Sequence, residues 1–345
     1  MKNVMSWIKG SFVKIFGSLV ILGVVIIFLV VLSTFSIGVA TQYGIKVPEI
    51  NSLISSQRVF YFGGFRNIWQ YISSCAELDE DMIYQPRVGS CEFLNIEFKT
   101  QLSFDSEGGK HNIPFDTGAH AIAVLGDSHA MGWGVGDSET FSSKLQSLTE
   151  RRVYNLGVSS YATERELDRL AAHAALDNID TIIIQYCDND LRSNPNYLID
   201  REIAVTKFQQ AMRAYGVKQN APLANSLVGA LKALMPQFVT GFNKFFVGGR
   251  PSIERRLPHR QSVERILTEY VEILQDKHVI VFFTSGHNKF KPNIENWVGS
   301  FTENGLDVDF IDLVLSEDDF FSIDDHLNMR GHNSIAQQIN SNYLQ

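Results

Sequence analysis

Residues 121–130, AIAVLGDSHA, join an apolar run to a turn with three consecutive polar side chains. A short segment that is apolar at every position is typical of a strand buried in a parallel sheet, where helices cover both faces. Asp127, Ser128 and His129 would then lie at the carboxyl end of that strand, which is where open α/β sheets bind ligands. This stretch therefore predicts a fold class and the location of a functional site.

Four more apolar segments follow the first along the chain, at residues 153–157, 181–186, 279–284 and 308–312. Segments with helical spacing of apolar residues separate them, and one of these starts with Thr163 and Glu166 in a capping-box pattern. Five strands that alternate with helices predict a three-layer α/β/α sandwich around a five-stranded parallel sheet.

The N-terminal part of the chain has a different composition. No charged residue occurs between Lys14 and Lys46, and residues 15–39 are dominated by Val, Ile, Leu and Phe. About 20 apolar residues span a bilayer as a helix, so residues 15–39 are predicted to be a transmembrane signal-anchor. Lys2, Lys9 and Lys14 place residues 1–14 in the cytoplasm by the positive-inside rule. The chain is then a single-pass inner-membrane protein whose main domain is periplasmic, the alternative being a cleaved signal peptide.

Residues 40–118 are expected to form a lead-in region with one strand near residues 98–104, ahead of a main domain at 119–345. Cys75 and Cys91 would form a disulfide in an oxidising compartment, the alternative being two unpaired thiols. Cys187, within an apolar segment, is interpreted as a small buried side chain rather than as a nucleophile.

Charge is unevenly distributed along the chain. The net charge is −8, although residues 1–46 contain four lysines and no acid. The acidic remainder argues against nucleic-acid binding, which requires basic groups to neutralise phosphates. Residues 201–260 contrast with it, because they hold ten basic and two acidic residues together with an apolar run at 227–246. This basic insertion suggests a lid, a surface for an anionic partner or a membrane interface, and the alternative is a helical excursion with a solvated basic face.

Polar residues also follow the other predicted strands. Gly157 comes after the second strand and can bring its N–H close to a substrate oxygen, and Asn189 comes after the third and can donate from its amide. Near the C-terminus, Asp324, Asp325 and His326 precede the last predicted helix. A serine, two candidate oxyanion donors and an acid-histidine pair are the groups that acyl transfer requires.

These four blocks, in this order, resemble the SGNH (GDSL-type) serine hydrolase superfamily over residues 119–345, and in particular its bacterial envelope-anchored esterases and O-acyltransferases. The resemblance implies that Ser128 is the nucleophile and His326 the base, with the Ser128 N–H, Gly157 and Asn189 as oxyanion donors. Two departures stand out: Cys187 occupies a place where the family has glycine, and Ile323 a place where it has the acid. The acid is then Asp324 or Asp325, and Asp324 is favoured because alternate side chains of an extended segment share a face.

His129, Trp133 and Asp190 are predicted to lie at the substrate pocket. No cofactor is expected, and no metal, because the histidines show no metal-binding spacing. The expected function is a membrane-anchored esterase or O-acyltransferase that acts on acyl esters, such as acetyl esters, of an envelope glycan. The alternatives are a non-catalytic glycan-binding or assembly scaffold of the same fold and a membrane-proximal lipase or lysophospholipase.

Overall fold

The computed structural model describes residues 14–29, 31–33, 66–105, 120–191, 201–220, 257–286 and 305–344, with isolated residues between these ranges. The chain divides into two compact units, Met1–Arg66 with Leu223–Gly248, and Asn67–Pro222 with Gly249–Gln345. The first contains the helix Lys14–Ser33, which is long and apolar enough to cross a membrane and has a mean hydropathy of 3.2. A signal sequence has the same properties, so the topology of the chain stays a prediction.

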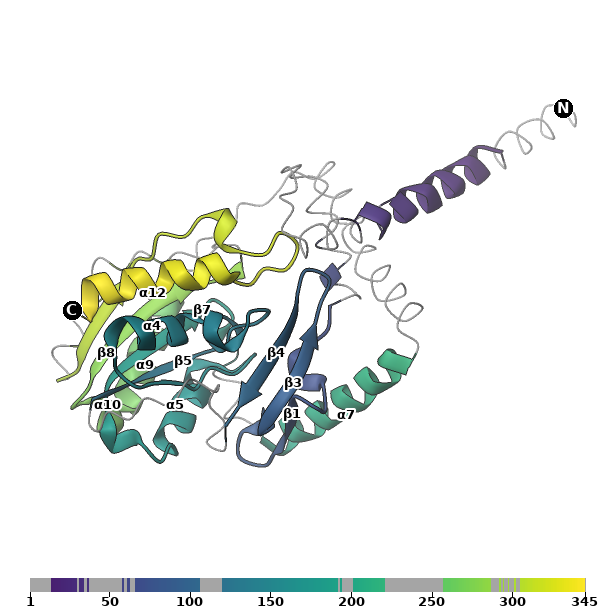
Figure 1. Ribbon diagram of the computed structural model, residues 1–345. Coiled ribbons are helices and arrows are strands. Elements are labelled where there is room, and N and C mark those ends of the chain that lie inside the picture. Colours follow the sequence, from purple (N-terminus) through teal and green to yellow (C-terminus); the bar gives the residue numbers. More distant parts are fainter. Residues whose placement is uncertain are drawn as a thin grey trace, which may run out of the picture. The chain divides into compact units, whose positions relative to one another are not determined.

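The second unit is built on the predicted five-stranded parallel sheet, in the order β6-β5-β7-β8-β9 (Figure 1). Its strands are β5 (Ala121–Gly126), β6 (Val153–Asn155), β7 (Ile179–Cys187), β8 (His278–Thr284) and β9 (Asp307–Ile311). All four pairings are parallel, and every residue of β5 is buried. The fold-class prediction is confirmed, with strand bounds that differ by at most two residues.

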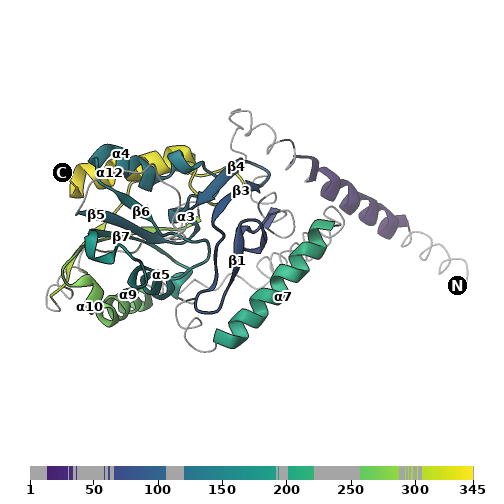
Figure 2. The ribbon, with the colours of Figure 1, turned by 60° about the horizontal axis from the view of Figure 1, so that its bottom comes forward.

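Helices cover both faces of this sheet (Figures 1 and 2). One face carries α4 (Phe141–Thr149) and α12 (Met329–Tyr343), and the other α5 (Thr163–Ala171), α9 (Leu257–Glu269) and α10 (Val271–Leu274). The strand β5 contributes side chains to the cores on both faces of the sheet. Ile122 and Val124 pack toward α4 and α12, and Ala123 and Leu125 pack toward α5 and α9. Alternation along a pleated strand produces the two cores.

The same unit contains shorter helical elements. They are α3 (Ser128–Met131), η2 (Trp69–Tyr71), η3 (Asp137–Glu139), η4 (Leu176–Asn178) and η6 (Glu317–Asp319). The predicted capping box at the start of α5 is wrong, because Ala162 is the N-cap and no side chain caps the helix. The Thr163 hydroxyl donates instead to Asp190 Oδ2, at 3.1 Å.

The lead-in region contributes two antiparallel hairpins to the same unit. The first pairs β1 (Ala76–Asp79) with β2 (Ile83–Pro86), and the second pairs β3 (Gly89–Leu94) with β4 (Lys99–Phe104). A disulfide joins Cys75 to Cys91 and so links the two hairpins. Their buried side chains share a core with Met131, Trp133 and Val158, which lie in the segments that follow β5 and β6.

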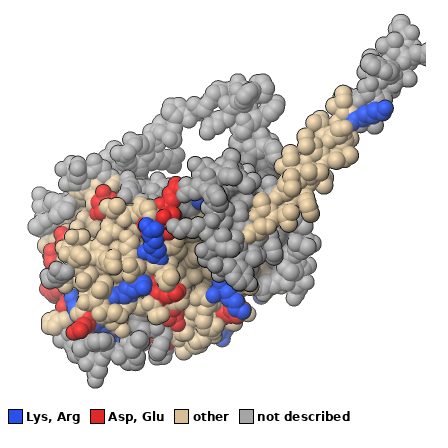
Figure 3. Space-filling view, turned by 45° about the horizontal axis from the view of Figure 1, so that its top comes forward, with Lys and Arg blue, Asp and Glu red and all other residues tan. Residues whose placement is uncertain are grey.

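Part of the basic insertion is described. It forms α7 (Arg201–Asn220), whose Phe208 stacks on Tyr84 of β2 with ring centroids 4.5 Å apart, and the start of α9. The apolar run at 227–246 and the basic residues Arg250, Arg255 and Arg256 lie outside the described residues. Where side chains are described on the face in Figure 3, basic and acidic groups are interspersed. An anionic partner at this insertion stays a prediction.

Candidate active site

Ser128 lies in a tight turn between β5 and α3. The strand ends at Gly126, which has a φ of 146°. A Cβ there would lie 2.5 Å from Gln185 Oε1 and 2.7 Å from Ala130 Cβ, so the turn requires glycine. Asp127 caps α3 by accepting the His129 N–H at 2.9 Å, and its own N–H donates to Gln185 Oε1 at 3.0 Å. The regular sheet and one buried amide therefore fix the position of the serine.

Ser128, His326 and Asp324 form a continuous chain of hydrogen bonds. Ser128 Oγ is 2.6 Å from His326 Nε2, and His326 Nδ1 is 2.5 Å from Asp324 Oδ1. A carboxylate can only accept, so Nδ1 carries the proton and Nε2 is left to accept from the serine hydroxyl. All three side chains are buried, with residue exposures of 8, 5 and 0% respectively. This is the geometry of a nucleophile, a general base and an orienting acid.

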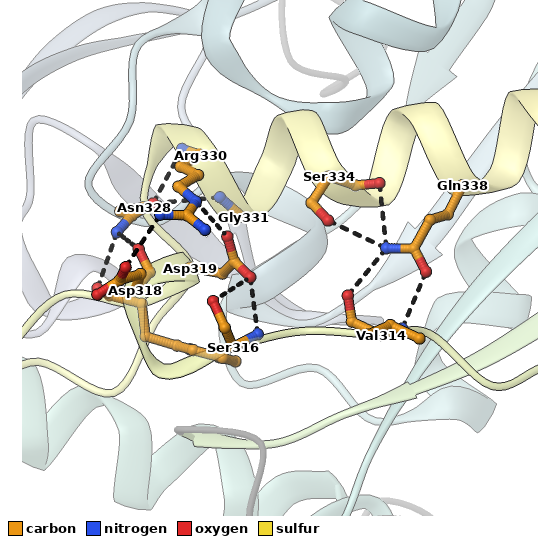
Figure 4. Close-up of polar contacts among 10 residues, drawn as sticks. Val314, Ser316, Asp318, Asp319, Asn328, Arg330, Gly331, Ser334 and Gln338 are labelled. Atoms are coloured by element: carbon orange, nitrogen blue, oxygen red, sulfur yellow. Dashed lines mark hydrogen bonds and ion pairs between the residues drawn. The ribbon is translucent and has the colours of Figure 1, made fainter.

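The loop that carries His326 runs between η6 and α12, and hydrogen bonds hold both of its ends. Asn328 caps α12 by accepting from the N–H groups of Arg330 and Gly331, while its Nδ2 donates to the carbonyls of Asp318 and Phe320. Arg330 also pairs with Asp318 and Asp319 (Figure 4).

A surface depression of about 410 Å³ lies between α12 and the segment at residues 314–316. Beside it, Gln338 bonds both the N–H and the carbonyl of Val314 (Figure 4). The polar groups drawn in Figure 4 thus bind one another and hold the segment after β9 against α12.

Trp133 and His129 pack against the ring of His326. The Trp133 ring stacks on it with centroids 4.6 Å apart, and its Nε1 donates to Asp324 Oδ2 at 3.2 Å. The His129 ring also lies against it, at 4.8 Å. Burial, and then the nearness of His326, lowers the pKa of His129 to about 4, so His129 is neutral at neutral pH. Two of the predicted pocket residues therefore contact the base directly.

Asp325 also lies near His326, with its Oδ1 3.4 Å from Nδ1. The expectation that it points away from the histidine is wrong, because the segment bends at residues 322–324 instead of running extended. Asp324 makes the shorter bond and is fully buried, whereas the Asp325 side chain is 35% exposed. Asp324, Asp325 and His326 have potential metal ligands within 4.8 Å of one another, but those of Asp324 and His326 bind each other.

The three predicted oxyanion donors are placed differently. Within the described part of the chain, no group accepts from the Ser128 N–H, which begins α3. The Gly157 N–H donates to Asn155 Oδ1 at 3.0 Å, so it must leave that acceptor to reach a substrate oxygen. Asn189 lies two residues after the end of β7, the neighbour of β5, and is exposed. The oxyanion roles of Gly157 and Asn189 stay predictions.

Asp190, predicted at the pocket, is fully buried beneath the turn that carries Asn189. Its Oδ2 accepts from the Cys187 N–H at 3.0 Å as well as from Thr163.

Burial, and then repulsion by Asp190 and Asp127, raises the pKa of the fully buried Glu166 well above its usual range. Burial also raises the pKa of the Cys187 thiol well above its usual range, which agrees with an unreactive side chain.

Several supporting residues were not singled out from the sequence. Asn155 at the end of β6 is buried, and its Nδ2 donates to Ala130 O and Ser142 Oγ. Gln185, buried in β7, holds the nucleophile turn. Glu97, in the turn of the second hairpin, accepts from the backbone N–H of Asp324. Gln185 could have been found from the sequence, because it is a polar residue within a mostly apolar strand. No feature of the sequence marks Glu97.

No family model and no curated protein matches this chain. Solved structures do. A lipolytic protein of the G-D-S-L family from Desulfitobacterium hafniense is 13% identical, with 63% of this chain and 98% of that one covered and a TM-score of 0.33. An acetylxylan esterase from Geobacillus stearothermophilus is 12% identical, with coverages of 66% and 95% and a TM-score of 0.32.

A lipase/acylhydrolase from Enterococcus faecalis is 16% identical, with 64% of this chain and 96% of that one covered and a TM-score of 0.33. The chain itself combines a five-stranded parallel α/β sheet with hydrogen-bonded Ser128, His326 and Asp324 at the carboxyl end of β5.

Proposed function

We propose that this protein is an SGNH-type serine esterase that cleaves acyl esters through a covalent intermediate on Ser128. The observation that carries the proposal is the unbroken contact from Ser128 Oγ through His326 to Asp324, at 2.6 and 2.5 Å. A buried hydroxyl and an imidazole of fixed tautomer are what nucleophilic attack on a carbonyl requires.

The first half of the reaction forms the acyl-enzyme. Ser128 Oγ bonds to the ester carbonyl carbon while His326 Nε2 takes the hydroxyl proton, and Asp324 stabilises the imidazolium that results. The Ser128 N–H, and with it the proposed donors Gly157 and Asn189, would stabilise the oxyanion, where the loss of one donor costs about 10²–10³ in rate. The alkoxide leaves with the proton from His326, and the acyl group stays on Ser128.

The second half removes the acyl group. Water, or a sugar hydroxyl, gives its proton to His326 and attacks the acyl carbon; the bond from that carbon to Ser128 Oγ then breaks, and Oγ takes the proton back from His326. With water as the acyl acceptor the protein acts as an esterase, and with a sugar hydroxyl as the acceptor it acts as an O-acyltransferase. Both acceptors use the same first half of the reaction.

Labelling by a fluorophosphonate probe tests the proposal. Wild-type protein should be labelled, and Ser128→Ala should lose all labelling while it keeps its folded far-UV circular dichroism spectrum. Ser147→Ala is the matched control, because Ser147 is exposed on α4 and its hydroxyl donates only to the backbone of Ser143. Continued labelling of Ser128→Ala would refute the assignment, and an inert wild type would favour the non-catalytic scaffold.

We further propose a short acyl group, such as acetyl, on an envelope glycan, with the chain anchored by the helix Lys14–Ser33. The enclosed position of His326, between Trp133 and His129, supports a small acyl group. The length and composition of the helix support the anchor. A higher kcat/KM for acetyl than for decanoyl esters is expected, and the opposite order would favour the lipase.

A further inference from the structure

Glu97 is a buried acid that the proposed mechanism does not use. It lies between β3 and β4 and is 5% exposed. Its Oε2 accepts from the N–H groups of Ile323 and Asp324, at 2.9 and 2.5 Å. Its Oε1 is buried and has no hydrogen-bond partner within the described residues. Burying a carboxyl group is costly, so its contacts call for an explanation.

The segment that Glu97 binds carries the acid of the triad. Ile323 and Asp324 are both fully buried, and they lie in a bend rather than in a helix or strand. Their N–H groups cannot be satisfied by a regular backbone ladder, and a buried N–H without an acceptor costs about 1–3 kcal/mol. One oxygen of the Glu97 carboxyl group accepts from both N–H groups. It thereby fixes the backbone from which the Asp324 side chain reaches His326.

The same hairpin supports this loop at two further places. Phe93 of β3 packs edge-on against Trp133, with ring centroids 4.6 Å apart, and Trp133 in turn contacts both His326 and Asp324. Phe98 packs on Phe321 at 5.1 Å. The second hairpin is therefore attached to the acid-base pair by aromatic packing as well as by Glu97.

We propose that Glu97 is a positioning residue for the reaction, which orients Asp324 through the backbone N–H groups of residues 323 and 324. The inference rests on the proposed esterase function and extends it, because it makes the lead-in hairpin part of the catalytic apparatus.

The charge of Glu97 gives the proposal a signature that packing alone would not have. Burial, with a further contribution from the Asp324 carboxylate, raises the pKa of Glu97 to about 7, against the opposing effect of the N–H groups of Asp324, Ile323 and Ser322. An ionised acceptor binds an N–H more strongly than a neutral one. Deprotonation of Glu97 should therefore strengthen its hold on the loop as the pH rises through 7.

The test compares Glu97→Gln and Glu97→Leu in the full chain, with p-nitrophenyl acetate as substrate. Glu97→Leu removes the acceptor, and a displacement of about 1 Å at a reacting group can cost about 10²-fold, so kcat should fall by about that factor while KM changes little. Glu97→Gln keeps a neutral acceptor. Its kcat should lie close to that of the wild type at pH 6 and fall progressively behind it toward pH 8.5.

Glu92→Gln is the matched control, because Glu92 lies in the same hairpin, is exposed and pairs only with Lys99, at 2.8 Å. Its kcat should equal that of the wild type at every pH. A folded Glu97→Leu with wild-type kcat would overturn the inference. If that variant does not fold, a kcat ratio of wild type to Glu97→Gln that stays constant between pH 6 and 8.5 would overturn it. An inert, unlabelled wild type would instead refute the esterase proposal itself.

Discussion

The turn that carries Ser128 and the loop that carries His326 meet at a contact of 2.6 Å, but different forces hold them. The turn continues a fully buried strand, so the hydrogen-bond ladder of the sheet determines where it ends. The loop belongs to no sheet. Its backbone makes one isolated bridge, between Phe320 and Leu327, and a bond from the Phe321 N–H to the His326 carbonyl. The side chains of Glu97 and Trp133, from distant segments, and of Asn328, at the start of α12, hold it in addition. The position of Ser128 thus depends mainly on the sheet, with one bond to the Gln185 side chain, and the position of His326 depends mainly on side chains. Substitutions on the two sides should then fail in different ways.

The largest effect is expected on the nucleophile side, from Gly157→Ala. A Cβ at Gly157 would lie 2.6 Å from Met131 N and 2.8 Å from Ala130 Cβ, so α3 must move and carry Ser128 with it. We expect a loss of about 1–3 kcal/mol in the free energy of unfolding, measured by urea titration, and labelling slowed by about 10²-fold.

Gly216→Ala is the control for that substitution. Gly216 lies in α7, and nothing is within 4 Å of a Cβ added there. This variant should be as stable as the wild type or more stable by about 1 kcal/mol, with normal labelling. Normal labelling of Gly157→Ala would show that the nucleophile turn does not depend on this close packing.

Trp133→Phe should produce a smaller effect on the base side, and kcat should show it. Phenylalanine keeps a ring against His326 but loses the N–H that donates to Asp324 Oδ2. A hydrogen bond to a charged group is worth about 1.5–3 kcal/mol, and we expect kcat to fall by about tenfold or more with KM little changed.

Trp297→Phe should show the opposite pattern, because Trp297 packs against Phe283 and Phe310 in the core beneath α9 and α10. It should lower the thermal midpoint and leave kcat unchanged. If Trp133→Phe lost stability in the same way and kept its kcat, the distinction between the two sides would fail.

The smallest effect concerns Glu166, beneath the nucleophile side. Its pKa is raised in the folded protein, so its contribution to stability is fully present below the unfolded pKa and is lost as the pH rises through the folded value. Glu166→Gln should therefore match the wild type near pH 4 and become the more stable protein in alkaline buffer.

Thermal unfolding between pH 4 and 9 measures this difference. The exposed Glu272→Gln should follow the wild type throughout. Parallel curves for Glu166→Gln and the wild type would mean that Glu166 is not held neutral in the fold.

The same contrast explains what could be predicted from the sequence. Strands buried on both faces are continuous apolar runs, so β5 and the residues after it could be located directly. The pairing of Ser128 with His326 and Asp324 also followed, because the resemblance supplied the order of the blocks. The support of the loop could not be predicted, since Glu97 is one acid among many and nothing in its neighbourhood marks a contact with residues 323 and 324. The local pattern at Thr163 predicted a cap, but a buried acid distant in sequence was the stronger partner.

The Ser128 to His326 contact joins residues 198 positions apart, and Glu97 lies 227 positions from Asp324. Such separations set a time order during synthesis. At roughly 5–20 residues per second, the ribosome adds His326 roughly 10–40 s after Ser128. Through that interval the nascent chain has a serine without a base to activate it. The proposed esterase activity can therefore begin only after His326 has been added, and the growing polypeptide cannot attack esters before that point.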